Sequence, residues 1–164
     1  MFDDLVSLLY PAYCYRCGDR LHKKQKYFCY GCEDLLPLHS NDNPLSGIFH
    51  ERMFNKLELS QAFSYFNYQK SGPIQELIHD FKYAGIKQIG AYYGHKLALD
   101  ISQTILYKPD LIIPVPLHKK KLRSRGYNQA QIIGEALGQT LQVPILLYGV
   151  HKRKDTLTQT KLSR

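Results

Sequence analysis

Four cysteines in two closely spaced pairs constrain the fold of this 164-residue chain more than any other feature. Cys14 and Cys17 form one CxxC pair, Cys29 and Cys32 form the second, and eleven residues separate the two pairs. Two thiolates spaced in this way reach one metal ion, and two such pairs complete the tetrahedral sulfur shell that zinc prefers. The alternative is a pair of disulfides. Four sulfurs leave no open coordination position, so the predicted zinc is structural.

The region around these cysteines predicts a small separate module. We expect a zinc-ribbon-like module over residues 1–40, a linker over 41–56 and a second domain over 57–164. The nearby His22 and His39 are interpreted as surface residues. The N-terminal segment carries acids where a secretory signal carries cations, and no apolar run is long enough to span a membrane. We therefore expect a cytoplasmic protein with reduced thiols, which disfavours the disulfides.

Apolar periodicity in the second domain predicts an α/β fold. Residues 59–66 alternate as in a strand, and the apolar runs 111–113 and 143–150 are predicted as two more strands. Helices are predicted from residue 74 to a stop at Gly85, then over 86–105 and 128–141. Strands that alternate with helices predict a mainly parallel sheet with flanking helices.

The net charge of +8 is concentrated beyond residue 110, where ten Lys and Arg residues face only Glu135 and Asp155. The cations form two clusters: Lys119, Lys120, Lys121, Arg123 and Arg125, and then Lys152, Arg153, Lys154, Lys161 and Arg164. The first cluster lies in a predicted loop between the strand 111–113 and a helix that Asn128 caps, with Gln131 completing a capping box. Ligands of open parallel sheets bind beyond the carboxyl ends of the strands, so this loop is placed to bind an anion such as phosphate. The alternative is that the lysine run is only a solvated face.

Several sequence blocks together resemble the ComF family of competence-associated proteins over nearly the whole chain. In order, they are CYRC, CYGC, IHDFKYAGIKQIG, PVPLHKKKLRSRGYNQA and RKDTLTQTKLSR. The resemblance implies a zinc finger followed by a type I phosphoribosyltransferase-like domain. It implies that pyrophosphate is bound within residues 114–126, by Pro116, Leu117, His118, Arg123, Arg125 and Gly126. It also implies a mobile loop that contains Arg153, Thr156, Gln159 and Arg164.

The function implied by the resemblance is a part in DNA uptake and natural transformation. The basic loops would bind single-stranded DNA or a phosphorylated ligand, and a competence helicase or other DNA-uptake proteins would be partners. On this hypothesis Lys119, Lys120 and Lys121 contact DNA phosphates, and Tyr127 stacks on a base. The tail 152–164 is the alternative DNA site.

An enzyme is the main alternative that the resemblance implies. It would be a phosphoribosyltransferase acting on phosphoribosyl pyrophosphate or a nucleotide, with Mg²⁺ in a complete homologue. The family's acid pair and Thr-Thr-Gly turn, which hold the ribose and its 5-phosphate, do not occur before Arg164. We therefore expect a domain incomplete at its C-terminus and assign no catalytic residue. A non-functional truncated fragment is the third hypothesis.

Overall fold

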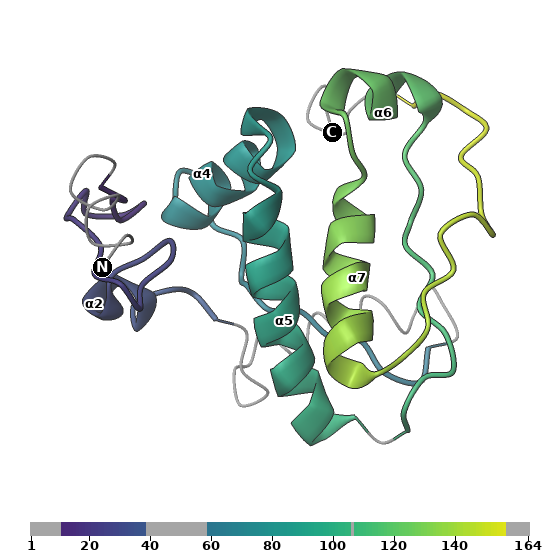
Figure 1. Ribbon diagram of the computed structural model, residues 1–164, viewed down its shortest axis with the longest axis horizontal. Coiled ribbons are helices and arrows are strands. Elements are labelled where there is room, and N and C mark those ends of the chain that lie inside the picture. Colours follow the sequence, from purple (N-terminus) through teal and green to yellow (C-terminus); the bar gives the residue numbers. More distant parts are fainter. Residues whose placement is uncertain (1–10, 39–58, 106, 157–164) are drawn as a thin grey trace. The chain divides into compact units, whose positions relative to one another are not determined.

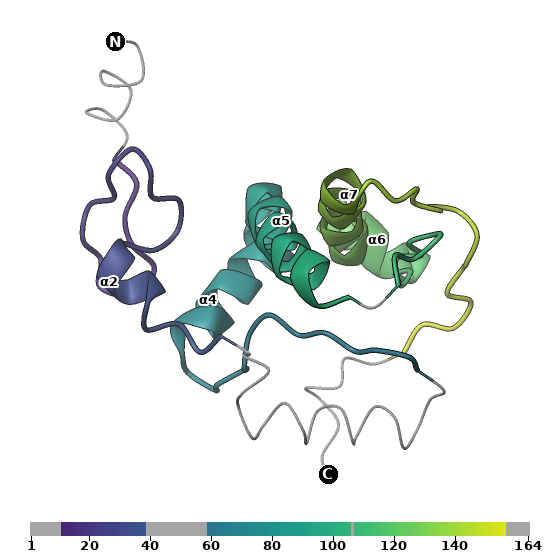
Figure 2. The same cartoon turned by 90° about the horizontal axis from the view of Figure 1, so that it is seen from below.

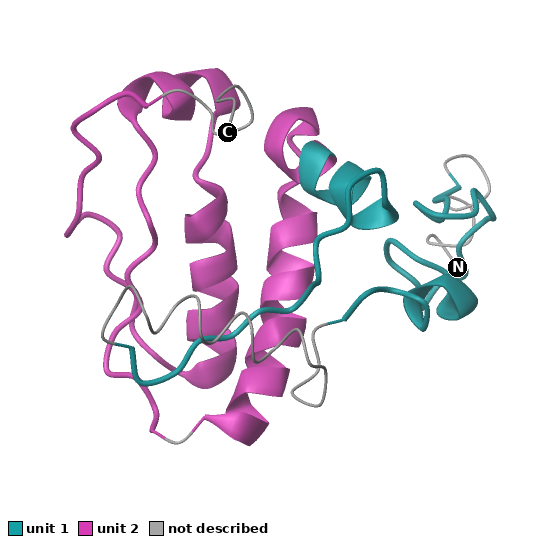
Figure 3. Ribbon diagram, turned by 180° about the vertical axis from the view of Figure 1, so that it is seen from behind, with its two compact units in different colours: residues 1–79 teal, residues 80–164 magenta. Residues whose placement is uncertain are grey.

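The structure is a computed structural model, and it describes residues 11–38, 59–105 and 107–156. The chain divides into two compact units, residues 1–79 and 80–164 (Figure 3). The predicted boundaries at residues 40 and 56 stay predictions, because the linker 41–56 lies outside the described residues. None of the helices in the described ranges is both long and apolar enough to cross a bilayer.

The described residues of the first unit contain the cysteine pairs and two short helices. Tyr13 forms an antiparallel bridge with Arg20, so the chain turns back on itself around the first pair. The second pair borders α2, which spans Tyr30–Glu33, and α4 follows at Pro73–His79 (Figure 1). Around the cysteine pairs, the buried apolar side chains are Phe28, which directly precedes the second pair and is 1% exposed, and Leu36, which is 7% exposed. A module with so little buried apolar surface needs a further source of stability.

The second unit is helical and contains the π-helix η1 at Asp80–Ala84, α5 at Lys87–Thr104, α6 at Lys119–Arg125 and α7 at Gln129–Leu141. The predicted helices over 86–105 and 128–141 are confirmed within one residue at each end. The predicted stop at Gly85 is confirmed as well, since its φ of 76° lies in the left-handed region that glycine tolerates.

Helices α5 and α7 pack side by side and form the core of the second unit (Figures 1 and 2). Gly94 on α5 permits the close approach. A β-carbon at this position would stand 3.0 Å from the Ala136 β-carbon and 3.1 Å from the Ile133 carbonyl oxygen, both on α7. The apolar stripe predicted for α5 supplies Ile89, Tyr93 and Ile101 as buried residues.

The predicted parallel sheet with flanking helices is wrong for the residues that the structure describes. These residues contain no β-strand, and the only pairings are isolated bridges. Residues 59–66, expected as a strand, make a single antiparallel bridge between Phe66 and Leu38. The α/β class is therefore corrected to a helical unit that follows a four-cysteine module.

The segments expected as strands 111–113 and 143–150 come closest to a sheet. Ile112 and Ile145 form a parallel bridge, with hydrogen bonds from the Ile112 N–H to the Pro144 carbonyl and from the Leu146 N–H to the Ile112 carbonyl, both 2.9 Å long. The pairing goes no further because Pro114 and Pro144 have no N–H to donate.

These two paired segments have one covered side and one open side. Ile112 and Ile145 reach within 3.4 Å of the place where a β-carbon on Gly134 of α7 would stand. The alternating residues Leu111, Ile113 and Val115 are exposed, with Val115 at 74%. Helix α7 thus covers one face of the pair, whereas a parallel sheet is normally covered on both.

Candidate metal and anion sites

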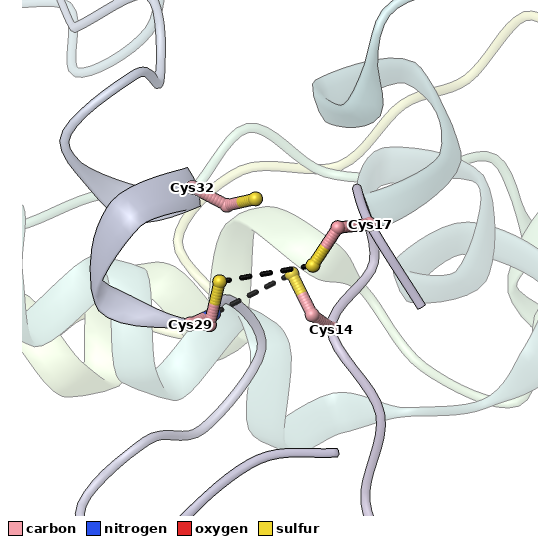
Figure 4. Close-up of side chains that lie close together, drawn as sticks. All are labelled: Cys14, Cys17, Cys29 and Cys32. Carbon is pink, nitrogen blue, oxygen red and sulfur yellow. Dashed lines mark hydrogen bonds between the residues drawn. The ribbon is translucent and has the colours of Figure 1, made fainter. Parts of the chain in front are cut away.

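The two cysteine pairs meet at one point in the first unit. The four side chains point toward one another, and their Sγ atoms all lie within 4.8 Å of one another (Figure 4). All four are free thiols, and the Sγ atoms of Cys17 and Cys29 are 3.7 Å apart. Sulfurs bound to one zinc at about 2.3 Å in a tetrahedron lie about 3.8 Å apart, so the donor set fits such an ion.

The local backbone builds both halves of this cluster. Gly18 has a φ of 74° and closes the turn after the first pair, where its N–H donates to the Cys14 carbonyl at 3.0 Å. Cys29 is the residue before α2, and Cys32 lies one turn into that helix. His22 is exposed, as expected, and His39 lies outside the described residues.

The surroundings of the cluster favour ionisation of one thiol, Cys14, and disfavour ionisation of another, Cys32. Burial disfavours ionisation of Cys14, but hydrogen bonds from backbone N–H groups, with those of Cys17 and Cys29 foremost, lower its pKa to about 6. The Cys29 N–H donates to the Cys14 Sγ atom at 3.4 Å. Burial, together with a hydrogen bond to the Cys29 side chain, raises the pKa of Cys32. A bound cation would remove this opposition by compensating the charge of several thiolates at once.

The first basic cluster is a helix in the structure rather than the predicted loop. Residues 119–125 form α6, because lysine, leucine and arginine favour helix and the segment contains no glycine or proline. Gly126 ends this helix with a φ of 82°, and its N–H donates to the Leu122 carbonyl at 2.8 Å. Gly126 therefore acts here as a helix cap.

The cations of α6 divide between two sides of the helix. Lys119 and Arg123 are four residues apart, so they share a side. Both are exposed, as is Lys120. These three residues are called the cationic face below. Lys121 and Arg125, also four apart, are only partly exposed.

The partly exposed pair makes contacts within the protein. The Lys121 Nζ donates to the Thr156 carbonyl at 2.8 Å. The Arg125 guanidinium donates to the Gln129 Oε1 atom at 2.6 Å and lies 5.3 Å from the centre of the Tyr83 ring. Arg125 thus ties α6 to α7 and η1, and it is less free to meet a ligand than the cationic face.

The structure brings part of the predicted mobile loop to the predicted phosphate site. The Asp155 carboxylate lies 3.5 Å from the His118 Nδ1 atom and 3.7 Å from the Lys120 Nζ atom. No sequence pattern pairs these residues, although Asp155 is the single acid within the second basic cluster. Arg153 is exposed, Pro116 and Leu117 are partly exposed, and Gln159 and Arg164 lie outside the described residues.

Tyr127 is buried, which argues against the base-stacking role expected for it. Its side chain is 7% exposed, and its hydroxyl donates to the Phe81 carbonyl. The two rings lie 6.0 Å apart, and the Lys87 Nζ atom is 5.2 Å from the centre of the Tyr127 ring. The ring packs inside the second unit between η1, α5 and the start of α7.

Asn128 caps α7 as predicted. Its side-chain oxygen accepts from the Ala130 N–H at 3.1 Å, and its Nδ2 atom donates to the Val115 carbonyl at 3.0 Å. The predicted capping box is wrong in its second half, because the Gln131 amide donates to Glu135 at 2.8 Å instead. Asn128 therefore holds the segment before α6 against the start of α7.

These features together define a class of protein in which a four-cysteine metal-type module precedes a helical unit with a strongly basic helix. Similarity to curated proteins identifies the family. The chain is 25% identical over 151 residues to Competence protein ComFC of Bacillus subtilis (strain 168), and 30% identical over 152 residues to Competence protein F of Haemophilus influenzae. Each match covers 92% of the chain. These relatives support assignment of the chain to the ComF family.

A shorter match and the lengths of the relatives complete the comparison. DNA utilization protein YhgH of Escherichia coli (strain K12) is 30% identical over 95 residues, which cover 56% of the chain. The chain spans 62% of the length of the B. subtilis relative, 58% of the H. influenzae relative and 42% of YhgH. No family model and no solved structure matches the chain.

Proposed function

We propose that this protein acts in DNA uptake, by binding the phosphates of single-stranded DNA on the cationic face of α6. The proposal is supported by the names of its relatives, which are competence and DNA utilization proteins. The observation that carries it is α6 itself, in which five of the seven residues are cations and none is an acid. Closely spaced exposed cations bind a phosphodiester chain by displacing its counterions, without regard to base sequence.

The four-cysteine cluster has a different task in this proposal. Cys14, Cys17, Cys29 and Cys32 would hold one zinc ion, which supplies folding free energy to the first unit. Four sulfur ligands leave no position for a substrate, so the ion is not a reaction centre. Since few apolar side chains besides Phe28 and Leu36 are buried around the cysteines, binding of the metal and folding of this module are coupled.

A phosphorylated small ligand offers the same chemistry to α6 as a DNA strand does. Phosphoribosyl pyrophosphate, a nucleotide and pyrophosphate all present clustered phosphate oxygens that Lys119, Lys120 and Arg123 can meet. Group transfer with Mg²⁺ also requires carboxylates. In the described residues beyond 110, the carboxylates are those of Glu135 and Asp155. Glu135 accepts from Gln131, and Asp155 lies beside His118 and Lys120. The proposal is therefore one of binding.

The test measures binding of a fluorescently labelled oligothymidine by anisotropy over a range of salt concentrations. The variant Lys119→Ala/Arg123→Ala should bind more weakly, and the slope of log affinity against log salt should fall by about 1.4, at about 0.7 for each lost phosphate contact. The control Lys23→Ala/Lys24→Ala removes the same charge from the first unit and should keep the slope. A cationic-face variant that binds like the wild type would contradict the proposal. Complete displacement of the oligonucleotide by low concentrations of pyrophosphate would favour a small phosphorylated ligand instead.

A further inference from the structure

Residues 155 and 156 contact three residues at the start of α6, counting the one that precedes it. The Asp155 carboxylate faces His118 and Lys120, and the backbone carbonyl of the next residue, Thr156, accepts from Lys121. One short segment therefore places two oxygen-bearing groups against the first turn of α6 and the residue that precedes it. Carboxylate and carbonyl oxygens are acceptors to which the cations of a phosphate site donate when no phosphate is bound.

We propose that residues 155–156 form a latch on α6, in which the Asp155 carboxylate is an internal anion that competes with external phosphate for the same cations. This inference rests on the proposed function and adds the regulation of its site. Lys120 belongs to the cationic face, and its Nζ atom lies 3.7 Å from the Asp155 carboxylate. A phosphate that pairs with Lys120 therefore competes with this carboxylate. Binding of the external anion then releases the segment that carries Asp155.

The contacts have the strength that a releasable latch requires. The Lys120 side chain is 78% exposed and the Asp155 side chain 38% exposed, so water and salt screen their attraction. The His118 Nδ1 atom is itself shielded from solvent, yet among the described residues it has no hydrogen-bond partner of good geometry, Asp155 included. The carboxylate is thus near its partners without being locked to them.

The geometry also explains why the local charge is arranged as it is. The first three cations of the second basic cluster, Lys152 to Lys154, directly precede Asp155, and the positive charge of α6 would repel them. A single acid at this position lets a basic segment lie against a basic helix. When the acid is displaced by an external phosphate, the lysines and arginine of this segment become available to the same polyanion.

The experiment compares the variant Asp155→Asn with the wild type and with Glu135→Gln. Glu135→Gln is the matched control because it removes the same charge from the second unit. Glu135 lies on α7, where it contacts Gln131. Asp155→Asn should bind labelled oligothymidine about two- to fivefold more tightly than the wild type, the range expected for loss of an exposed ionic competitor. Glu135→Gln should differ from the wild type by less than this.

Limited trypsin digestion without any ligand provides the second readout. Cleavage after Lys152, Arg153 and Lys154 should be faster in Asp155→Asn than in the wild type, and the wild type should approach the variant when oligothymidine is added. If the wild type binds DNA and Asp155→Asn binds equally well, the latch is wrong and the proposed function stands. If no form binds DNA or pyrophosphate, the proposed function fails and the competition fails with it. In that case equal trypsin cleavage also rules out the contact itself.

Discussion

At the scale of single residues, three consecutive positions decide how α6 joins α7. Gly126 ends α6 with a left-handed φ, Tyr127 is buried under the turn, and Asn128 caps α7. Each residue has a property that its neighbours lack: freedom of φ, a large ring with a hydroxyl, and a short side chain that accepts a backbone N–H. The short block GYN therefore fixes the geometry of the turn between the basic helix and the core.

The first prediction concerns Gly126. Gly126→Ala should lower the free energy of unfolding by about 1 kcal/mol, because a β-carbon is unfavourable at a φ of 82°. Gly126→Asn should lose less, since asparagine tolerates the left-handed region. Urea denaturation followed by circular dichroism measures both variants. Equal stability of Gly126→Ala and the wild type would show that this turn does not hold the conformation described.

The second prediction concerns the cysteines. The purified protein should contain one zinc per chain, and Cys29→Ser should lose stoichiometric zinc, whereas the exposed His22→Ala should keep it. Acidification from pH 7 toward pH 5 should release the ion, because thiolates must take up protons as it leaves. Zinc binding releases protons from the thiols, so the affinity for zinc falls as the pH falls. Metal analysis after dialysis at each pH measures the outcome, and full zinc occupancy in Cys29→Ser would contradict it.

At the scale of elements, helices were predicted well from the sequence and the sheet was not. The stripe on α5 and the cap on α7 depend on residues within one segment, so their spacing was sufficient. The sheet depends on pairing between distant segments, and apolar runs such as 111–113 carry no information on how far a ladder extends. The flanking prolines, Pro114 and Pro144, were the signal that the pairing would be brief.

The candidate site was predicted in its composition but not in its arrangement. Spacing alone identified the four cysteines, because a CxxC pair is a local feature. The run Lys119 to Arg125 was recognised as basic, but it was expected as a loop between a strand and a helix. The contact between Asp155 and His118 joins residues 37 positions apart, and no sequence pattern encodes it.

The third prediction concerns the contact between α5 and α7. Gly94→Leu should destabilise the second unit by about 1–3 kcal/mol, because the added side chain has no room beside Ala136 and the Ile133 carbonyl. Gln103→Leu, at an exposed position on α5, is the matched control and should change stability little. Thermal unfolding monitored by helical circular dichroism compares the two. A stable Gly94→Leu protein would mean that the helices are not packed as closely as described.

At the scale of the molecule, the paired segments of the second unit expose several large apolar side chains. The exposed residues of the paired segments are Leu111, Ile113, Val115, Leu146, Tyr148 and Val150. Large apolar side chains exposed on neighbouring segments promote association with other apolar surfaces. These residues also explain why the sequence predicted a buried sheet. Both faces of the paired segments carry apolar side chains, and α7 covers one of these faces.

The fourth prediction follows from this surface. Ile113→Lys/Val115→Lys should reduce both the binding of a hydrophobic dye and the tendency to associate at high protein concentration, because charge interrupts the apolar surface. Leu99→Lys, a comparably exposed apolar position on α5, should change either property less. Dye fluorescence and light scattering over a concentration series provide the measurements. Unchanged scattering and fluorescence in the double variant would place the association, if any, elsewhere.

The buried hydroxyl of Tyr127 has a consequence for amide exchange with deuterated solvent. Burial raises the pKa of Tyr127, so near neutral pH the group stays protonated and donates to the Phe81 carbonyl of η1. Tyr127 follows directly after the cap of α6, so this bond joins the turn at the end of α6 to the π-helix. Tyr127→Phe removes the bond, so the backbone amides of residues 80–87 should exchange faster in this variant than in the wild type.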